Sequence, residues 1–201
     1  INVQSSADIF DEDDDLSFSP VPGYQGEEYV NFGSDNQLPF EIIKMIGRDE
    51  VMSQNKLFNV LTCYGAGQKY MDYETEKPTK DKDIKRWMFG NNLASFMLEQ
   101  ATDMKYFFFA VSVIILSKDG TRINKLRHKE ACYCRFQRPD KQGRIKHVYY
   151  ANWRLSGLKP EQVERISLLD INDPFGDLEM LMGRLSMICS PQAGSSNISS
   201  P

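Results

Sequence analysis

The chain has 201 residues, which fits one ordinary domain or part of a larger protein and is enough to bury a substantial core. Hydrophobic residues make up 41% and charged residues 26% of it, and both values are typical of a globular protein. The formal net charge of −4 argues against a free-standing, sequence-independent DNA-binding domain, because such a domain replaces the counterions around phosphate with Lys and Arg.

The two ends of the chain differ in composition from the rest. Residues 11–15 read DEDDD, and five adjacent acids repel one another and cannot be buried together. We therefore expect residues 1–27 to be an acidic mobile tail, which serves either as a solubilising extension, the favoured alternative, or as a mimic of nucleic acid. The low-complexity sequence QAGSSNISSP predicts a frayed tail over residues 186–201. A single domain is expected over residues 28–185.

Two helices are predicted at the start of this domain. Pro39, with Glu41 in the first turn, indicates a helix whose apolar stripe runs to Gly47. A second helix is predicted over residues 51–64 and is ended by the glycines of residues 65–67. These glycines follow a helix, whereas a dinucleotide-binding loop places its glycines between a strand and a helix.

The next predicted elements are a short strand over residues 70–73 and a long amphipathic helix over residues 83–103. The sequence Gly-Asn-Asn at residues 90–92 is expected to bend this helix. Trp87 and Met88 belong to its apolar stripe, which is more typical of a core or a subunit interface than of a cofactor site.

Two hairpins follow over residues 104–153. The first turns at Asp119-Gly120, a pair suited to the positive φ angles of a tight turn. The second turns at residues 140–143 and resumes with the β-prone residues 148–150. The sequence thus predicts an α+β fold in which N-terminal helices precede an antiparallel sheet of hairpins across residues 106–150.

The end of the domain has weaker signals. Pro160 indicates a short helical turn, and residues 166–171 read as a strand that residues 172–174 close. No strong membrane signal is present, because the longest apolar run, residues 106–116, is far too short to cross a bilayer.

Reduced cysteines in a cytoplasm are expected, because no secretory signal stands at the start of the chain. The four cysteines are Cys63, Cys132, Cys134 and Cys189. Cys132 and Cys134 would share one face of a predicted strand, where neighbouring thiols rarely reach disulfide geometry.

The best candidate metal site combines Cys132 and Cys134 with His128 and His147. Zinc prefers paired ligands whose spacing aims both side chains at one point, and a C-x-C pair on a strand is poorly suited to this. Buried thiols and surface histidines are therefore favoured over a zinc site. The same two histidines lie in charged surroundings, which argues against a nucleophilic triad.

A second candidate site is the pair Asp170 and Asp173, which could bind magnesium as in a nuclease. A D-x-x-D sequence followed by proline is more typical of a turn with capping carboxylates, and this alternative is favoured. No catalytic, cofactor-binding or metal-binding residues are expected.

Basic residues are concentrated in the two hairpins. With the aromatic side chains of Phe136, Tyr149, Tyr150 and Trp153 between them, they could form a surface for single-stranded nucleic acid. They could equally protect sheet edges from aggregation or pair with acids of a neighbouring subunit, and this second alternative is favoured. The residues are Lys125, Arg127, Lys129, Arg135, Arg138, Lys141, Arg144, Lys146 and Arg154.

The order of several segments resembles the portal proteins of tailed bacteriophages, particularly those of Bacteroides-type prophages. The resemblance covers residues 29–185 and is carried by NFGSDNQLP, QNKLFNVLTCYGAG, the long helix ending in ATD, LRHKEACYCRF and VYYANWR. Each motif is loose, so their order carries most of the resemblance. Portal proteins are much longer, and this chain stops before their stem and clip helices, so the resemblance is to the N-terminal wing portion.

The resemblance implies a structural, non-enzymatic protein of a phage or prophage. It implies a homo-oligomeric ring at the capsid vertex of the virion, assembled in the host cytoplasm, through which DNA is packaged and ejected. The implied partners are further copies of the chain, other head or packaging proteins, and DNA in weak, sequence-independent contact, with no membrane and no cofactor. Trp87, Met88 and Trp153 are candidates for exposed subunit contacts. The alternative is a stand-alone α+β nucleic-acid-binding or metal-dependent nuclease-like protein.

Overall fold

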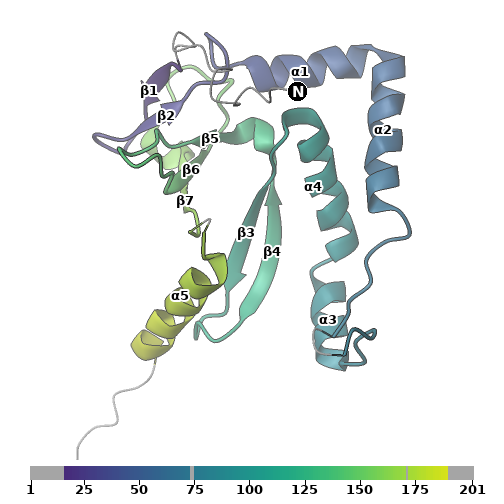
Figure 1. Ribbon diagram of the computed structural model, residues 1–201. Helices are drawn as coiled ribbons and strands as arrows, with labels where there is room; N and C mark the ends of the chain where they lie inside the picture. Colours follow the sequence, from purple (N-terminus) through teal and green to yellow (C-terminus); the bar gives the residue numbers. More distant parts are fainter. Residues whose placement is uncertain (1–15, 73–74, 171, 190–201) are drawn as a thin grey trace, which may run out of the picture. The chain divides into compact units, whose positions relative to one another are not determined.

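The computed structural model describes residues 16–72, 75–170 and 172–189. In this part of the chain, five α-helices and three small antiparallel sheets make an α+β fold (Figure 1). The chain divides into two compact units. Unit 1 contains the described residues up to 53 together with residues 132–168, and unit 2 contains residues 54–131 and those from 169 onward.

Unit 1 contains two sheets. Strands β1 (Phe18–Pro20) and β2 (Glu28–Val30) form a pair, and β5 (Cys134–Phe136), β6 (His147–Tyr150) and β7 (Glu164–Ser167) form a three-stranded sheet with β6 in the middle. All pairings are antiparallel. The buried core is mostly aromatic and aliphatic and consists of Val21, Tyr29, Tyr149, Ala151, Trp153 and Val163.

The expected boundary of the acidic tail at residue 27 is too late. The acidic run 11–15 lies outside the described residues, but β1 already pairs with β2, and Val21 is part of the core of unit 1. Val21 belongs to the core and Tyr24 packs against it, so the folded domain already includes the segment from Phe18 onward. The expected C-terminal tail also lies mostly outside the described residues.

Helices α1 (Leu38–Arg48) and α2 (Glu50–Tyr64) closely match the two predicted helices. Pro39 occupies the first turn of α1, where its missing N–H costs no hydrogen bond. Gly65 ends α2 with a φ of 58°, which is the left-handed conformation that glycine adopts without steric cost.

The predicted long helix of unit 2 is two helices, α3 (Lys82–Gly90) and α4 (Leu93–Phe107). Asn92 has a φ of 47°, so the right-handed helix cannot continue through it. The Asp81 carboxylate caps α3 by accepting the backbone N–H groups of Asp83 and Ile84. The predicted strand over residues 70–73 is reduced to a single bridge between Met71 and Pro78; Tyr73 lies outside the described residues.

The first predicted hairpin is present, but its start was predicted wrongly. Tyr106 and Phe107 belong to the end of α4, and Phe108, with a φ of 61°, ends that helix. Strands β3 (Val111–Leu116) and β4 (Ile123–Lys129) then pair as a two-stranded antiparallel ribbon. The turn between them uses Gly120 with a φ of 68°, as the Asp-Gly pair predicts.

The two hairpins do not share one sheet, contrary to the prediction. A 3-10 turn over Ala131–Tyr133 separates β4 from β5. Cys132 lies in this turn, and only Cys134 lies on a strand. The prediction that both thiols share one strand face is therefore wrong.

The last elements differ most from the sequence prediction. A 3-10 turn at Pro160–Gln162 is present as expected, but β7 ends at Ser167 rather than at residue 171. Helix α5 (Pro174–Cys189) was not predicted. Over the described ranges, none of the helices combines the length and the apolar character that crossing a bilayer requires.

Candidate functional site

The side chain of Arg135 is completely buried in unit 1. Its guanidinium donates to the backbone oxygens of Cys132 (3.0 Å), Cys134 (2.8 Å) and Asn36 (2.8 Å), and also to Asn36 Oδ1. These partners are carbonyl and amide oxygens and carry no full negative charge. Burial therefore dominates and lowers the pKa of Arg135 to about 10.

Aromatic rings complete the surroundings of this cation. The guanidinium carbon lies 4.8 Å from the ring centre of Phe32 and 5.6 Å from that of Trp153, which is within the range of cation–π attraction. Trp153 Nε1 donates to the Tyr133 backbone oxygen (2.7 Å), and Gln37 Nε2 donates to the Trp153 backbone oxygen (2.8 Å).

These residues join segments that are far apart in the sequence, and we name them the Arg135 cluster: Phe32, Asn36, Gln37, Tyr133, Arg135 and Trp153. The loop of residues 31–37 is fixed onto β5 and onto the segment after β6 through these contacts. Asn36 adopts a φ of 60° within the loop, and its own backbone oxygen then accepts from Arg135. The contacts of the cluster therefore fix the backbone conformation of the loop that leads into α1.

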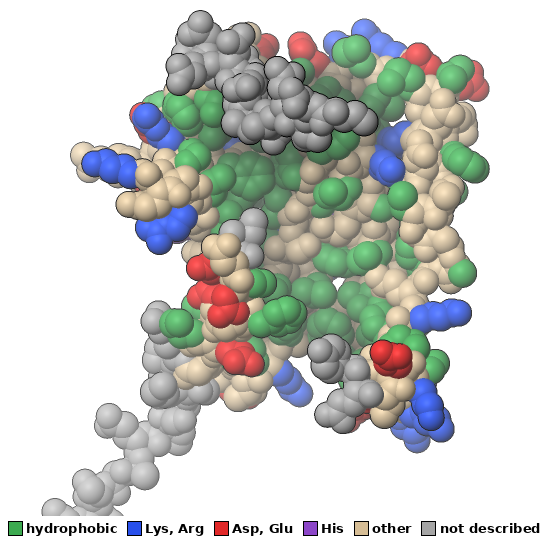
Figure 2. Space-filling view, in the orientation of Figure 1, with side chains coloured by type: hydrophobic (Ala, Val, Ile, Leu, Met, Phe, Trp, Pro, Cys, Tyr) green, Lys and Arg blue, Asp and Glu red, His purple; other side chains and the backbone are tan. Residues whose placement is uncertain are grey.

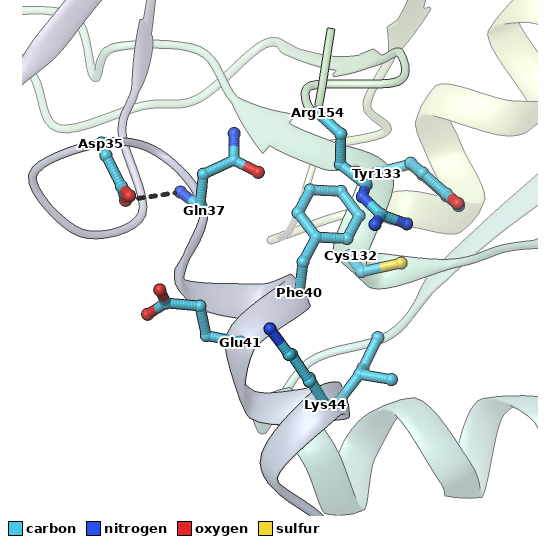
Figure 3. A pocket seen from close by; sticks show the side chains of 9 residues that line it. Asp35, Gln37, Phe40, Glu41, Lys44, Cys132, Tyr133 and Arg154 are labelled. Carbon is cyan, nitrogen blue, oxygen red and sulfur yellow. Dashed lines mark hydrogen bonds between the residues drawn. The ribbon is translucent and has the colours of Figure 1, made fainter. Parts of the chain in front are cut away.

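A shallow pocket of about 490 Å³ lies beside the cluster (Figure 3). Phe40 and Tyr133 give it an apolar centre, and Asp35, Glu41, Lys44 and Arg154 line it with charges of both signs. The guanidinium carbon of Arg154 lies 5.5 Å from the ring centre of Phe40. An apolar centre within mixed charges suits the surface of another protein better than one small ion.

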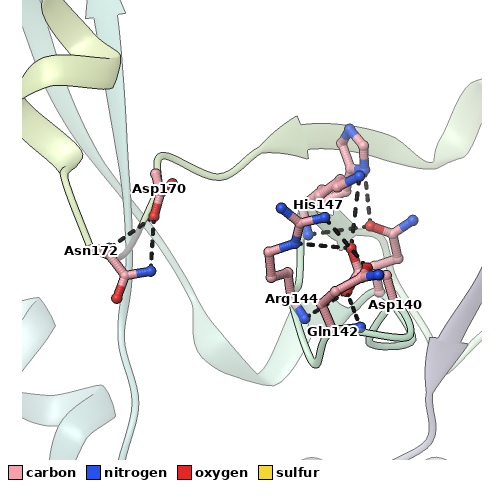
Figure 4. Close-up of polar contacts among 8 residues, drawn as sticks. Asp140, Gln142, Arg144, His147, Asp170 and Asn172 are labelled. Atoms are coloured by element: carbon pink, nitrogen blue, oxygen red, sulfur yellow. Dashed lines mark hydrogen bonds and ion pairs between the residues drawn. The ribbon is translucent and has the colours of Figure 1, made fainter.

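Three basic residues of the second hairpin, Arg138, Arg144 and Lys146, form ion pairs with acids of unit 1. Asp140 lies 3.2 Å from Arg144 Nε and 3.8 Å from Lys146 Nζ (Figure 4). Arg138 pairs with Glu28 at 2.7 Å. Backbone N–H donation to Asp140, first of all from Arg144, lowers the pKa of its carboxyl.

Arg135, which was counted among the surface cations, is buried, and the surface prediction for it is wrong. Trp153 was expected to be exposed and is also buried, at 5% exposure. The candidate nucleic-acid surface of the second hairpin therefore loses one of its cations, Arg135, and two of its aromatic rings, Tyr149 and Trp153, to the interior of unit 1.

His128 lies in unit 2 and is buried, contrary to the expectation of a surface histidine. Its side chain is 8% exposed and that of Asp103 is 11% exposed, and His128 Nε2 lies 3.1 Å from Asp103 Oδ2. The other ring nitrogen, Nδ1, lies 2.7 Å from Gln100 Nε2, while the Ala131 backbone N–H donates to Asp103 Oδ2 at 2.7 Å. This network attaches α4 to the end of β4, and burial raises the pKa of Asp103.

The four residues of the candidate zinc site have other partners. His147 Nδ1 lies 3.1 Å from Gln137 Oε1 and 3.4 Å from Arg165, and burial lowers its pKa. Cys132 and Cys134 are buried, as predicted. No group of three potential metal ligands occurs among the residues that the structure describes.

Asp170 and Asp173 have the turn and capping roles that the sequence favoured. Asp170 Oδ1 accepts the backbone N–H of Asn172 at 2.9 Å (Figure 4). Asp173 Oδ1 accepts the backbone N–H of Gly176 at 2.9 Å and so caps α5. Both side chains belong to exposed residues.

The Arg135 cluster was missed by sequence reasoning, although one signal was present. Arg135 stands between Cys134 and Phe136 on a short, otherwise apolar strand, so residue types that are typical of a protein core flank its charge on both sides. Its partners Asn36 and Phe32 are about one hundred residues away, and no periodicity links them.

Comparisons with models of protein families, with curated proteins and with solved structures find no match to this chain.

Proposed function

We propose that this chain is a structural subunit of a portal-type ring at the capsid vertex of a tailed phage, through which DNA is packaged and ejected. Three of the segments that carry the resemblance support the proposal, because they form one physical cluster. NFGSDNQLP supplies Asn36, LRHKEACYCRF supplies Arg135 and VYYANWR supplies Trp153 to the same set of contacts. Three of the five motifs of the resemblance thus contribute to one cluster of contacts in unit 1.

The observation that carries the proposal is an apolar stripe on the outer face of α2. Val60 is the buried residue of this helix. Val51 and Phe58 lie on roughly the opposite side, and Leu61, three residues after Phe58, lies beside Phe58 at about 100° from Val60. Val51, Phe58 and Leu61 are 70%, 69% and 50% exposed. Figure 2 shows hydrophobic side chains at the right-hand edge of the view, where Figure 1 places α2.

A helix that is apolar on its outer as well as its inner face is typical of a subunit that buries this face against a partner. We propose that this partner is a second copy of the chain, because a ring requires contacts between identical subunits. The stripe replaces the interface residues expected from the sequence. Trp153 is buried, and Trp87 is half-buried and donates to the Ile123 backbone oxygen at 2.8 Å.

The test is self-association of the full chain, measured by sedimentation over a range of concentrations and by electron microscopy. We expect ring-like or lower oligomers that Phe58→Ser weakens at least about tenfold, since removing an apolar anchor commonly costs more than 1 kcal/mol of binding free energy. Asn59→Ser, at an exposed position of the same helix that lies off the stripe, is the matched control and should leave association unchanged. A chain that stays monomeric at every concentration would refute the proposal.

The alternative of a magnesium-dependent nuclease has a separate test. Asp170 and Asp173 contact backbone N–H groups in their turns, and we expect no cleavage of DNA with magnesium. Cleavage that is lost on Asp170→Asn would overturn the structural proposal in favour of the nuclease.

A further inference from the structure

The β3–β4 ribbon of unit 2 has one protected edge and one open edge. On the β4 side, Trp87 Nε1 donates to the Ile123 backbone oxygen at 2.8 Å. The Leu126 backbone N–H donates to Asn91 Oδ1 at 3.0 Å. Both side chains come from α3 or the residue that follows it, so they cover the outer edge of β4 (Figure 1). The opposite edge belongs to β3, which pairs with β4 alone among the described strands.

The hydrogen-bond pattern identifies the backbone groups at this open edge. Successive residues of an antiparallel strand direct their N–H and C=O groups alternately toward and away from the partner strand. The Ser117 N–H donates to the Arg122 oxygen at 2.9 Å, so Ser117 faces the β4 side. Leu126 directs its N–H to Asn91, so the residue opposite it on β3 directs its own groups away from β4. Both observations place the same residues of β3 at the open edge: Ser112, Ile114 and Leu116.

The open edge has none of the usual protection against strand pairing. Outside the β3–β4 ladder, no hydrogen bond among the described residues reaches the backbone groups of Ser112, Ile114 or Leu116. Proteins commonly protect such an edge with Lys, Pro or a bulge, but β3 reads VSVIIL and contains neither a charged residue nor a proline. The register shift of the ribbon skips Asn124 on β4, so β3 itself stays regular. A further strand can therefore pair with it.

The two faces of the ribbon indicate which side chains such a strand would carry. Lys125 and Arg127 lie opposite Ile115 and Val113 and share one face with them. Both cations are exposed, and neither forms an ion pair with a carboxylate of the described residues. An added strand would lie about 10 Å from β4, two strand spacings away, and a Lys or Arg side chain together with a Glu side chain spans that distance.

The other face of β3 is mostly apolar, because Ile114 and Leu116 point to it. A strand beside β3 thus meets apolar side chains on one face and free cations on the other. Since side chains alternate along an extended segment, the matching sequence alternates β-branched apolar residues with acids.

We propose that the open edge of β3 binds an extended polypeptide segment of a partner protein as an additional antiparallel strand, with apolar residues on the Ile114 face and acids on the Lys125 face. Backbone hydrogen bonds supply the affinity in this mode of recognition, and alternate side chains supply the specificity. Antiparallel addition continues the pairing of the ribbon and is slightly more stable per residue than parallel addition. The inference uses only unit 2 and does not depend on ring formation.

The test is the fluorescence anisotropy of a short labelled peptide of alternating Val and Glu, capped at both ends and titrated with the full chain. We expect it to bind at least about tenfold more tightly than the corresponding peptide of alternating Val and Lys. The double variant Lys125→Gln/Arg127→Gln should remove this preference. No binding by the Val-Glu peptide, or a preference that survives in the double variant, would overturn the proposal.

Backbone pairing has its own test in N-methylated peptides. In the proposed antiparallel arrangement, the Val residues lie opposite Ser112 and Ile114 and direct their N–H groups at β3. Methylation of the Val nitrogens should therefore weaken binding at least about tenfold, whereas methylation of the Glu nitrogens, which point away from β3, should leave it unchanged. Equal losses, or a larger loss from the methylated Glu peptide, would contradict strand addition in this arrangement.

A variant of the chain tests the same edge from the other side. Ser112→Pro removes an N–H that points away from β4, and proline is tolerated at such positions of an edge strand. It should weaken binding of the Val-Glu peptide at least about tenfold. Ser112→Ala, which keeps the N–H of this exposed residue, is the matched control and should bind as the unchanged chain does. Circular dichroism checks that both variants fold, and unchanged binding by a folded Ser112→Pro chain would refute the assignment.

Discussion

Arg135 combines complete burial with a set of uncharged partners, and this sets its energetic role. Each of its hydrogen bonds satisfies a buried oxygen, and the two rings beside it attract the cation. Burying a charge has a large desolvation cost. The hydrogen bonds and the cation–π contacts of Arg135 together offset this cost. Removing the side chain leaves the oxygens of Cys132, Cys134 and Asn36 without their donor.

We expect Arg135→Ala to lower the free energy of unfolding by about 3 kcal/mol or more, because several buried acceptors lose their partners at once. Urea denaturation followed by circular dichroism measures this. Arg138→Gln is the control, since Arg138 forms an exposed ion pair with Glu28 that is worth at most about 1 kcal/mol. Equal effects of the two substitutions would contradict the role given to Arg135.

Asp103 makes the stability of unit 2 depend on pH. Burial raises its pKa above the ordinary value of 3.8, so between 3.8 and the raised value the folded chain binds more protons than the unfolded chain. Acidification through this window therefore stabilises the folded state, and that gain is lost as pH rises. Relative to Asp103→Asn, the unchanged chain should gain stability as pH falls from 7 towards 4.

The measurement is the difference in unfolding free energy between the two proteins by urea denaturation at several pH values. A difference that is constant, or that moves in favour of the Asn variant on acidification, would show that the ionised carboxyl is preferred beside His128.

Helix α3 illustrates how local capping starts an element. Asp81 Oδ1 lies 2.7 Å from the Asp83 nitrogen and 3.3 Å from the Ile84 nitrogen. We expect Asp81→Ala to lower the free energy of unfolding by about 1 kcal/mol. Asp83→Ala, which removes an exposed i,i+3 pair with Arg86, should change it by less than about 0.5 kcal/mol. Thermal denaturation compares the two, and a larger loss from Asp83→Ala would contradict the capping assignment.

The elements that the sequence predicts well depend on local signals. Asp119-Gly120 places the first turn because the pair tolerates positive φ, and the glycine after Tyr64 ends α2 for the same reason. The elements that it misses depend on distant contacts. The aromatic residues Tyr106 and Phe107 suit a strand locally, but they form the end of α4. The hydroxyl of Tyr106 there accepts a hydrogen bond from Lys56 Nζ at 2.6 Å.

The candidate site likewise combines features that neighbouring residues determine with features that distant contacts determine. The turn role of Asp170 and the capping role of Asp173 follow from the residues next to them, and both are favoured by the sequence. The burial of Arg135 and His128 depends on Asn36 and Asp103, whose positions in space no local pattern predicts. For this reason charged residues that read as surface cations are found inside the protein.

At the scale of the whole molecule, we expect a destabilising substitution in one unit to increase local unfolding of that unit and not of the other. Arg135→Ala removes contacts within unit 1, and Asp103→Asn changes contacts within unit 2. We expect hydrogen exchange to accelerate in β5 and β6 for the first variant and in β3 and β4 for the second. Acceleration across all four strands in both variants would mean that the chain opens as a single cooperative unit.

The metal content of the whole chain is a further prediction. His128 has both ring nitrogens engaged by Asp103 and Gln100, and a metal would have to displace one of them. We expect well under one zinc per chain by elemental analysis of the purified protein. A full equivalent of zinc that is lost on Cys132→Ser would contradict this.

The chain has two tryptophans, and each unit contains one of them. Trp153 lies in the buried cluster of unit 1, and Trp87 of unit 2 donates its indole N–H to the Ile123 backbone oxygen. The indole emission spectrum depends on the polarity around the ring, so Trp87→Phe leaves a chain whose fluorescence comes from unit 1 alone, and Trp153→Phe leaves one whose fluorescence comes from unit 2. The natural sequence thus supplies an optical reporter for each unit, and no dye is needed to follow the unfolding of either one.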